Sequence, residues 1–360
     1  MKKIVIFTQN LDIGGVQKSV KTLSHYLASY CDIKIVLAED NKNIAYDFHN
    51  ITILKIKTLD IDISKRDVGQ MLFDYRIQEF DKILKQVQPD IVISYEDYNN
   101  LISLNTQYKC KKIISCRVSI CDSFKNKRIH LLSEEFYHEN IQKYYPFADK
   151  IICVGKHIEK ELINDFSLSN SMTIYNGIKT HQEKVEDIKY DNFIVTIGRL
   201  HPQKGQKDLI VAFDMIKDKI SQKLLIVGDG IEKDNLQSLI DKLNLNDRVF
   251  LMGFDTPYKY IKKCDLFIFP SYYEGFSNTI LEVMSMKKNI VSYNYKGSEE
   301  ILFPENIVES ANIESLANRI LFYIENKNSN DILENKLYQR SQEFSLDQTL
   351  LNYKMEILSI

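Results

Sequence analysis

Two carboxylates, Glu274 and Glu282, stand eight residues apart in a stretch that follows an apolar run ending at Phe269. Glu274 lies in a Gly-containing loop, and Ser277 or Asn278 can cap the helix that we expect to carry Glu282. Carboxylates accept hydrogen bonds from the vicinal hydroxyls of a sugar or a ribose. The free N–H groups that begin a helix bind phosphate oxygens. The segment therefore predicts a sugar and phosphate site, with a plain surface helix position as the alternative for Glu282.

Two cations follow a second apolar run, at residues 193–197. Arg199 and Lys204 stand five residues apart in a loop that begins at Gly198 and ends at Gly205. The planar fork of Arg and the point charge of Lys together can hold a diphosphate leaving group. The alternative is that both are ordinary surface cations.

Further glycines stand where predicted strands end. Gly14 and Gly15 follow the run 4–7 and open a helical pattern, and Gly228 follows the run 223–227. Glycine allows the backbone to approach a phosphate closely, although a simple tight turn explains the Gly14 pair equally well. The Gly-Asp-Gly sequence from Gly228 lacks the GxGxxG spacing, so we do not expect a dinucleotide fingerprint there.

The elements that position these residues form two α/β domains. Short apolar runs alternate with amphipathic helical patterns in both halves, as is typical of parallel sheets. For 360 residues we expect an N-terminal domain over 1–180, a C-terminal domain over 181–340 and a final helix over 341–360. Open α/β sheets bind ligands at the carboxyl ends of their strands, where all the residues named above are predicted to lie.

Composition and charge argue against several classes of protein. A formal net charge of -2 argues against a nucleic-acid binder, and no apolar run approaches a transmembrane span. Lys2 and Lys3 precede an apolar stretch too short for a signal peptide, so we expect a cytoplasmic protein rather than a periplasmic binding protein. The six cysteines have no CxxC pair and no zinc-finger spacing, so we expect no metal ligands among them.

One segment is strongly basic. Residues 101–130 contain seven basic residues and one acidic residue. Such a run is either a solvated face or a contact with anionic lipid or phosphate.

The stretch from Ser271 to Glu282 resembles the EX7E motif of retaining GT-B glycosyltransferases of family 4, with Glu274 and Glu282 as its two acids. The resemblance extends over nearly the whole chain, through Gly14-Gly15, Tyr175–Gly177, Gly198–Gly205, Val227–Gly230, Arg248–Phe254 and Gly297–Glu300. It implies two Rossmann-like domains that face each other across a cleft, with the final helix crossing back to the N-terminal domain. It also implies donor binding in the C-terminal domain, acceptor binding in the N-terminal domain, no metal or other cofactor, and retention of the anomeric configuration.

The same resemblance implies a role for each site residue. Arg199 and Lys204 would hold the donor diphosphate, Glu274 would contact the transferred sugar, and Glu282 would bind the nucleotide ribose. The other donor-binding residues that it implies are Gly14, Gly15, Gly198, Gly228, Phe276, Ser277, Asn278 and Thr279.

The chain departs from the family pattern in two places. Many relatives have a His after the strand near 113–115, where this chain continues to Arg117, which we expect to bind an acceptor phosphate or a sugar carbonyl. Many relatives also have Gly and Pro where this chain has residues 286–289, which leaves the local turn open.

We therefore expect transfer of a hexose or N-acetylhexosamine from a nucleotide sugar, UDP-linked, to a hydroxyl of a lipid-linked bacterial surface glycan. The nearest pattern is that of N-acetylgalactosaminyl and galactosyl transferases, and segment 101–130 would contact the inner face of the cytoplasmic membrane. A nucleotide-sugar epimerase and a non-catalytic partner subunit that binds nucleotide sugar remain as alternatives. Asp60-Ile61-Asp62 is a DxD sequence, which metal-dependent transferases use, but it lies far from any Gly loop and we expect no metal there.

Overall fold

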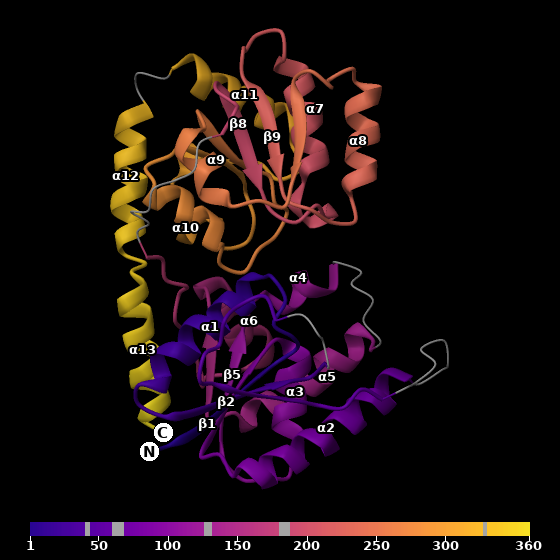
Figure 1. The fold of residues 1–360 in the computed structure, drawn as a ribbon, viewed down its shortest axis with the longest axis vertical. Coiled ribbons are helices and arrows are strands. Elements are labelled where there is room, and N and C mark those ends of the chain that lie inside the picture. The colour runs from indigo at the N-terminus through magenta and orange to yellow at the C-terminus, as the bar shows by residue number, and fades with distance from the viewer. Residues whose placement is uncertain (40–43, 60–67, 126–131, 180–187, 327–329) are drawn as a thin grey trace. The chain divides into compact units, whose positions relative to one another are not determined.

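The computed structural model describes residues 1–39, 44–59, 68–125, 132–179, 188–326 and 330–360. These residues form two compact units (Figure 1). Unit 1 consists of Met1–Asn176 together with Gln348–Ile360, and unit 2 consists of Gly177–Asp347. The DxD sequence at 60–62 lies outside the described residues.

Unit 1 is built on a parallel sheet of seven strands in the order β3-β2-β1-β4-β5-β6-β7. The strands are β1 (Lys3–Thr8), β2 (Asp32–Leu37), β3 (Thr52–Lys55), β4 (Ile91–Tyr95), β5 (Lys111–Cys116), β6 (Lys150–Cys153) and β7 (Ser171–Thr173). Its helices are α1 (Gly15–Ala28), α2 (Val68–Val87), α3 (Asp97–Asn105), α4 (Ile120–Lys125), α5 (Glu134–Tyr144), the 3-10 turn η1 (Tyr145–Phe147) and α6 (Lys156–Phe166). Strands β1 and β4 are buried apolar runs, as expected for a parallel sheet covered on both faces.

The last helix of the chain, α13 (Leu346–Leu358), contributes its residues from Gln348 onward to unit 1. Lys150 and Glu356 form an ion pair across this packing, and Lys2 Nζ donates to the carbonyl of Ile360 at 2.7 Å. Thr349 Oγ1 donates to the carbonyl of Tyr175 at 3.2 Å. The two ends of the chain are therefore held together in one unit.

Unit 2 is built on a parallel sheet of six strands in the order β10-β9-β8-β11-β12-β13. The strands are β8 (Phe193–Ile197), β9 (Lys223–Val227), β10 (Val249–Gly253), β11 (Leu266–Phe269), β12 (Ile290–Tyr293) and β13 (Ile307–Val308). Its helices are α7 (Gln206–Ile216), α8 (Lys233–Lys242), α9 (Pro257–Lys263), α10 (Asn278–Ser285), α11 (Ile313–Glu325) and α12 (Asn330–Gln342), with 3-10 turns η2 (Pro202–Lys204), η3 (Ser298–Glu300) and η4 (Pro304–Asn306).

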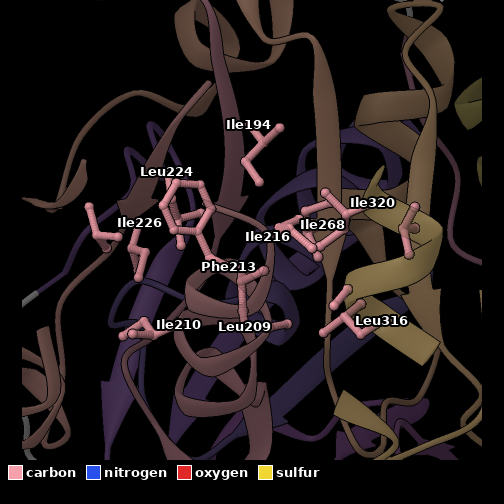
Figure 2. Close-up of a cluster of buried hydrophobic side chains, with 14 of the residues drawn as sticks. Ile194, Leu209, Ile210, Phe213, Ile216, Leu224, Ile226, Ile268, Leu316 and Ile320 are labelled. Carbon is pink, nitrogen blue, oxygen red and sulfur yellow. The ribbon is translucent and has the colours of Figure 1, made fainter. Parts of the chain in front are cut away.

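The core of unit 2 lies between this sheet and helices α7 and α11. Figure 2 shows aliphatic and aromatic side chains of α7, β9 and α11 meeting in one buried cluster. Phe213 of α7, Leu224 of β9 and Ile320 of α11 are fully buried in it. Burial of apolar surface on this scale provides most of the stability of such a unit. No helix among the described residues has the length and apolar character needed to cross a bilayer.

Each sheet has one point at which the strand order reverses. In unit 2, β8 pairs with β9 on one side and with β11 on the other, so the chain winds in both directions from β8. In unit 1, β1 has the same position between β2 and β4. Ligands of open α/β sheets bind outside the carboxyl ends of the strands at such a switch point. The loops after β8 and β11, and those after β1 and β4, are therefore the candidates.

Candidate active site

The loops after β8 and β11 bring together two residues that lie in separate sequence motifs. Lys204 Nζ donates to Glu274 Oε1 at 2.5 Å. Their side chains are 18% and 13% exposed. The ion pair is therefore mostly buried, but it is still reached by solvent. A charge-assisted bond in such a setting is stronger than one on the open surface. The pair marks the switch point of unit 2.

The Lys204 side chain has a defined path to this pair. Its Nζ lies 5.5 Å from the centroid of the Phe269 ring, a cation–π contact. Its aliphatic carbons pass over Gly198, where an added Cβ would lie 3.7 Å from Lys204 Cδ. The stem is therefore packed, and only the ammonium group is aimed at the site.

The backbones of the two loops also touch directly. Gly205 has a φ of +62°, and a Cβ there would lie 2.1 Å from the carbonyl oxygen of Pro270. The N–H of Tyr272 donates to the carbonyl of Gln203 at 2.9 Å, and Gln203 Nε2 donates to the carbonyl of Tyr273 at 2.8 Å. Only glycine fits at position 205, and the positions of Lys204 and Glu274 are coupled through this frame.

The loop after β9 closes on the other side of the loop after β8. Gly228 has a φ of +144°, and a Cβ there would lie 1.9 Å from the carbonyl oxygen of Gly198. Position 228 therefore requires glycine because neighbouring strand ends lie in close contact there, and binding of a donor by Gly228 stays a prediction. Arg199 lies on the same loop with an exposed side chain, and its role at a diphosphate stays a prediction.

Helix α10 begins at the site and carries the second acid. Ser277, rather than Asn278, is the N-cap, because its Oγ accepts from the N–H of Ile280 at 3.3 Å. Asn278 and Thr279 are the first residues of the helix and are half-buried. Their N–H groups belong to the first turn, where backbone donors have no carbonyl partner within the helix and can bind a ligand.

Glu282 is buried in the structure, at 7% exposed. The alternative interpretation, a plain surface position on the helix, is therefore wrong. Glu282 Oε1 accepts a hydrogen bond from the Tyr258 hydroxyl at 3.3 Å. Phe276, which precedes the cap, is also buried and packs edge-on against Phe344 at a ring distance of 5.1 Å. A buried acid that keeps a neutral hydroxyl partner is suited to accepting further hydroxyl donors.

A network of tyrosines around Asp208 supports the loop of Glu274, and sequence reasoning missed it. Asp208 Oδ2 accepts from the hydroxyls of Tyr272, at 2.7 Å, and Tyr293, at 3.0 Å. Burial, together with the Asp208 carboxylate, raises the pKa of both phenols, so both stay protonated as donors. These residues come from α7, β12 and the loop after β11, and no local signal links them.

In unit 1, the residues predicted to bind the sugar donor and the sugar acceptor lie on neighbouring elements. Gly14 is the N-cap of α1 and Gly15 its first residue. Arg117 follows β5, and its Nη2 donates to Ser19 Oγ of α1 at 2.9 Å and to Asn176 Oδ1 at 2.8 Å. The guanidinium is therefore held by its own unit, and its binding to an acceptor stays a prediction.

Two acids at the end of β4 were not singled out in the sequence. Glu96 has a φ of +72°, a strained conformation for a residue with a side chain. Asp97 Oδ1 accepts from the Tyr145 hydroxyl at 2.8 Å, while burial, and more weakly Glu161, raise its pKa to about 6. Their position after a central strand was the available signal, because β4 and β1 form the switch point of this unit.

Several cations of the basic segment 101–130 bind other residues of unit 1. Lys112 is buried, and its Nζ donates to the carbonyl of Ser103 at 2.7 Å and to Thr106 Oγ1 at 2.8 Å. Burial lowers its pKa. Lys111 pairs with Asp149 at 2.8 Å. Arg117 is also bonded inside unit 1, whereas Lys109 is exposed and residues 126–131 lie outside the described chain. Contact of this segment with anionic lipid or phosphate stays a prediction.

Two local features bear on the remaining predictions. The turn after α10 forms despite its unusual sequence, with Lys287 at a φ of +55°, the left-handed conformation that glycine adopts more easily. In unit 1, ligand atoms of Cys121, Glu161 and Asp165 lie within 4.8 Å of one another. Two of these three are exposed, and acidic groups often gather in this way without a metal, so we assign none to them.

The edge of unit 2 thus combines the ammonium group of Lys204, two acids and the start of a helix, and Arg199 lies on the same loop. The ammonium group and the helix N–H groups can bind phosphate oxygens, and the acids can accept from hydroxyls. This donor and acceptor set fits a phosphate ester of a polyhydroxylated ligand such as a nucleotide sugar.

Comparison with known proteins gives the same picture for both halves of the chain. Residues 13–182 match the model of Glycosyltransferase Family 4, and residues 178–342 match that of Glycosyl transferases group 1. A Campylobacter jejuni N-acetylgalactosamine-N,N'-diacetylbacillosaminyl-diphospho-undecaprenol 4-alpha-N-acetylgalactosaminyltransferase is 28% identical over 96% of each chain. A poly(ribitol-phosphate) alpha-N-acetylglucosaminyltransferase of Staphylococcus aureus is 26% identical over 73% of this chain and 53% of its own.

Solved structures show the same fold. Sucrose-phosphate synthase from Thermosynechococcus elongatus superimposes with a TM-score of 0.86 at 17% identity, covering 99% of this chain and 98% of its own. Anabaena HepE, in complex with UDP and glucose, superimposes with a TM-score of 0.80 at 19% identity over 100% of both chains. With these two glycosyltransferase matches in succession over residues 13–342, this chain is a glycosyltransferase and has the GT-B fold of two parallel α/β units.

Proposed function

We propose that this glycosyltransferase moves a hexose or N-acetylhexosamine from a UDP-linked sugar to a hydroxyl of a lipid-linked surface glycan. The donor would bind at the carboxyl edge of unit 2, and the acceptor at that of unit 1. The observation that carries the proposal is the Lys204–Glu274 pair at the switch point of unit 2, with the buried Glu282 on the adjoining helix.

Relatives and structural neighbours support the choice of substrates. The Campylobacter relative is named for transfer of N-acetylgalactosamine onto a diphospho-undecaprenol glycan, and the Anabaena neighbour was solved with UDP and glucose. A Staphylococcus aureus TarM structure, which superimposes with a TM-score of 0.77, also contains UDP. We therefore place a UDP-sugar at unit 2.

The residues of unit 2 would act on charge and position. The bond between the sugar C1 and the diphosphate oxygen breaks, while the acceptor oxygen forms a new bond to C1. Arg199, Lys204 and the start of α10 stabilise the negative charge that develops on the leaving diphosphate. The acceptor proton passes to a leaving phosphate oxygen. We favour attack on the same face of the sugar, with retention, and charge stabilisation by these cations in place of a metal ion.

Contact with the inner face of the cytoplasmic membrane is part of this proposal, because the acceptor would be lipid-linked. Lys109 is an exposed cation of the basic segment. Flotation with vesicles of neutral and anionic lipid tests the electrostatic contact. Binding that ignores lipid charge and salt would contradict it.

The donor assignment is tested by the melting temperature of the protein with a panel of UDP-, GDP- and ADP-sugars without added metal. A ligand at 100 times its Kd adds about 2.7 kcal/mol, which is a clear shift. We expect UDP-sugars alone to stabilise the protein, and transfer to a lipid-linked acceptor to follow with the same sugar. Stabilisation by none of them would contradict the donor site, and turnover of donor without acceptor would favour an epimerase.

A further inference from the structure

One buried hydroxyl beside the site has no partner. Tyr295 follows β12 and is 3% exposed, and its hydroxyl oxygen makes no hydrogen bond with any residue of the described chain. Buried polar groups are nearly always satisfied, because leaving one unpaired destabilises the fold. An unpartnered donor next to a binding site therefore points to a partner acquired in another state.

The surroundings of Tyr295 identify that partner. Its ring lies 6.1 Å from the ring of Phe269, over which Lys204 Nζ lies at 5.5 Å. The same ammonium group is bonded to Glu274. Burial, and the negative charges of Glu274 and Glu300, raise the pKa of Tyr295, so its hydroxyl keeps its proton and can only be a donor toward a carboxylate.

The pairing of Lys204 with Glu274 creates a conflict in the proposed function. Lys204 is required at the donor diphosphate, but in the free protein its ammonium group is bonded to Glu274. If Lys204 turns to the diphosphate, Glu274 loses a charge-assisted hydrogen bond while only 13% of its side chain is exposed. A carboxylate in that position needs a replacement donor to keep its orientation.

We infer that Tyr295 is a positioning residue for Glu274, and that its hydroxyl donates to Glu274 when Lys204 leaves for the donor diphosphate. The inference rests on the proposed function. Tyr295 makes no contact with the reacting atoms and transfers no proton. When the donor is bound, Tyr295 holds the Glu274 carboxylate toward the sugar. In the free protein its hydroxyl makes no hydrogen bond with the described residues.

Removing Lys204 should produce the second state without any substrate, which separates this test from the proposed reaction. We would measure the melting temperatures of four proteins, namely the native chain, Tyr295→Phe, Lys204→Met and the double variant. Methionine keeps the apolar stem over Gly198 and Phe269. In the native background, Tyr295→Phe should leave the melting temperature unchanged or raise it, because it removes an unpartnered hydroxyl. In the Lys204→Met background, Tyr295→Phe should lower the melting temperature by about 3 °C or more, because there the hydroxyl donates to Glu274.

Tyr293→Phe is the matched control. Its hydroxyl already donates to Asp208 at 3.0 Å, so the substitution should lower the melting temperature equally in both backgrounds. Equal changes for Tyr295→Phe in both backgrounds, or a larger loss in the native one, would show that Tyr295 only fills space.

A second readout uses the donor that stabilises the native protein. Tyr295→Phe should lower kcat/KM for that donor about tenfold, although the free variant is as stable as the native protein. Unchanged kcat/KM would overturn the inference. If Lys204→Met does not fold, this comparison of stability and kcat/KM decides the inference alone. If no donor binds, the proposed function fails while the melting cycle still decides the role of Tyr295.

Discussion

The two sheets carry different kinds of structure at their switch points. In unit 2 the loops after β8, β9 and β11 touch through backbone, with Gly205 against Pro270 and Gly228 against Gly198. In unit 1 the corresponding edge is formed by polar side chains. Gln9 Nε2, after β1, donates to Glu39 Oε1 at 2.5 Å, and Glu96 and Asp97 follow β4.

This difference shows which part of each site is free to change. Backbone contacts through glycine leave little room for variation, and they suit a diphosphate, which UDP-, GDP- and ADP-sugars all share. A rim of side chains can be altered residue by residue without disturbing the strands beneath it. If the proposed function is right, the acceptor edge is where this chain is specialised.

The largest expected effect is that of Gly228→Ala. The new Cβ would lie 1.9 Å from the carbonyl oxygen of Gly198, at a φ of +144°, and neither strand end can move cheaply. We expect a loss of about 4 kcal/mol or more in the stability of unit 2. Hydrogen exchange should show lost protection in peptides of β8 and β9, with peptides of β1 and β4 protected as before. Gly198→Ala, whose Cβ meets Lys204 at 3.7 Å, is the control and should cost about 1 kcal/mol or less.

The next effect is on turnover. Lys204→Ala should lower kcat/KM for sugar transfer at least about tenfold, and toward 100-fold, because it removes a preorganised charge from the leaving group. Lys207→Ala changes an exposed lysine three residues away and should leave transfer unchanged. Full activity in Lys204→Ala would refute the role of the ion pair in the reaction.

A smaller effect distinguishes the two edges by pH. Asp97 has a pKa of about 6 in the folded protein, above its ordinary value near 4, so its ionisation lowers stability as pH rises from about 4 to 6. Asp97→Asn should therefore stabilise the protein by about 2 kcal/mol above pH 6 and have little effect below pH 4. Melting temperatures measured from pH 4 to 8 give this difference directly.

Asp255 of unit 2 provides the opposite sign. Burial raises the pKa of its carboxyl, but hydrogen bonds from Lys259 and Tyr260 outweigh burial and hold the pKa below its usual value. Asp255→Asn should lower the melting temperature at neutral pH and lose this effect as the pH falls below about 4. If Asp97→Asn and Asp255→Asn both raised, or both lowered, the melting temperature at neutral pH, the acids at the two sheet edges would not differ in this way.

The smallest effect is that of Gly14→Ala in unit 1. The backbone of Gly14 is extended, and an added Cβ would meet the flexible end of Gln17, with Oε1 at 2.3 Å. Since that side chain can turn away, we expect a stability change within about 1 kcal/mol by urea unfolding. A loss as large as that of Gly228→Ala would mean that both edges depend on glycine in the same way. Unchanged stability with impaired transfer would assign Gly14 to ligand binding.

Much of the fold and part of the site were predictable because they depend on local sequence. Apolar runs of the right length indicated the strands, and the serine before α10 indicated its cap, since both signals act over a few residues. The order of motifs also placed Lys204 and Glu274 at the same sheet edge. The burial of Glu282 and of Lys112 was not predictable, because it depends on which distant elements cover each side chain.

The sequence by itself determined the alternation of strands and helices, the glycines at the strand ends and the residue types available for phosphate and hydroxyl binding. Only the tertiary structure decided which of them meet. The strand order β9-β8-β11 joins Lys204 to Glu274 across seventy residues of chain. Tyr295, which follows β12, packs its ring against Phe269 and feels the charge of Glu274, while its hydroxyl has no partner among the described residues. Strand order and side-chain burial depend on the folding of the whole unit. Patterns over a few residues therefore do not predict strand order or side-chain burial.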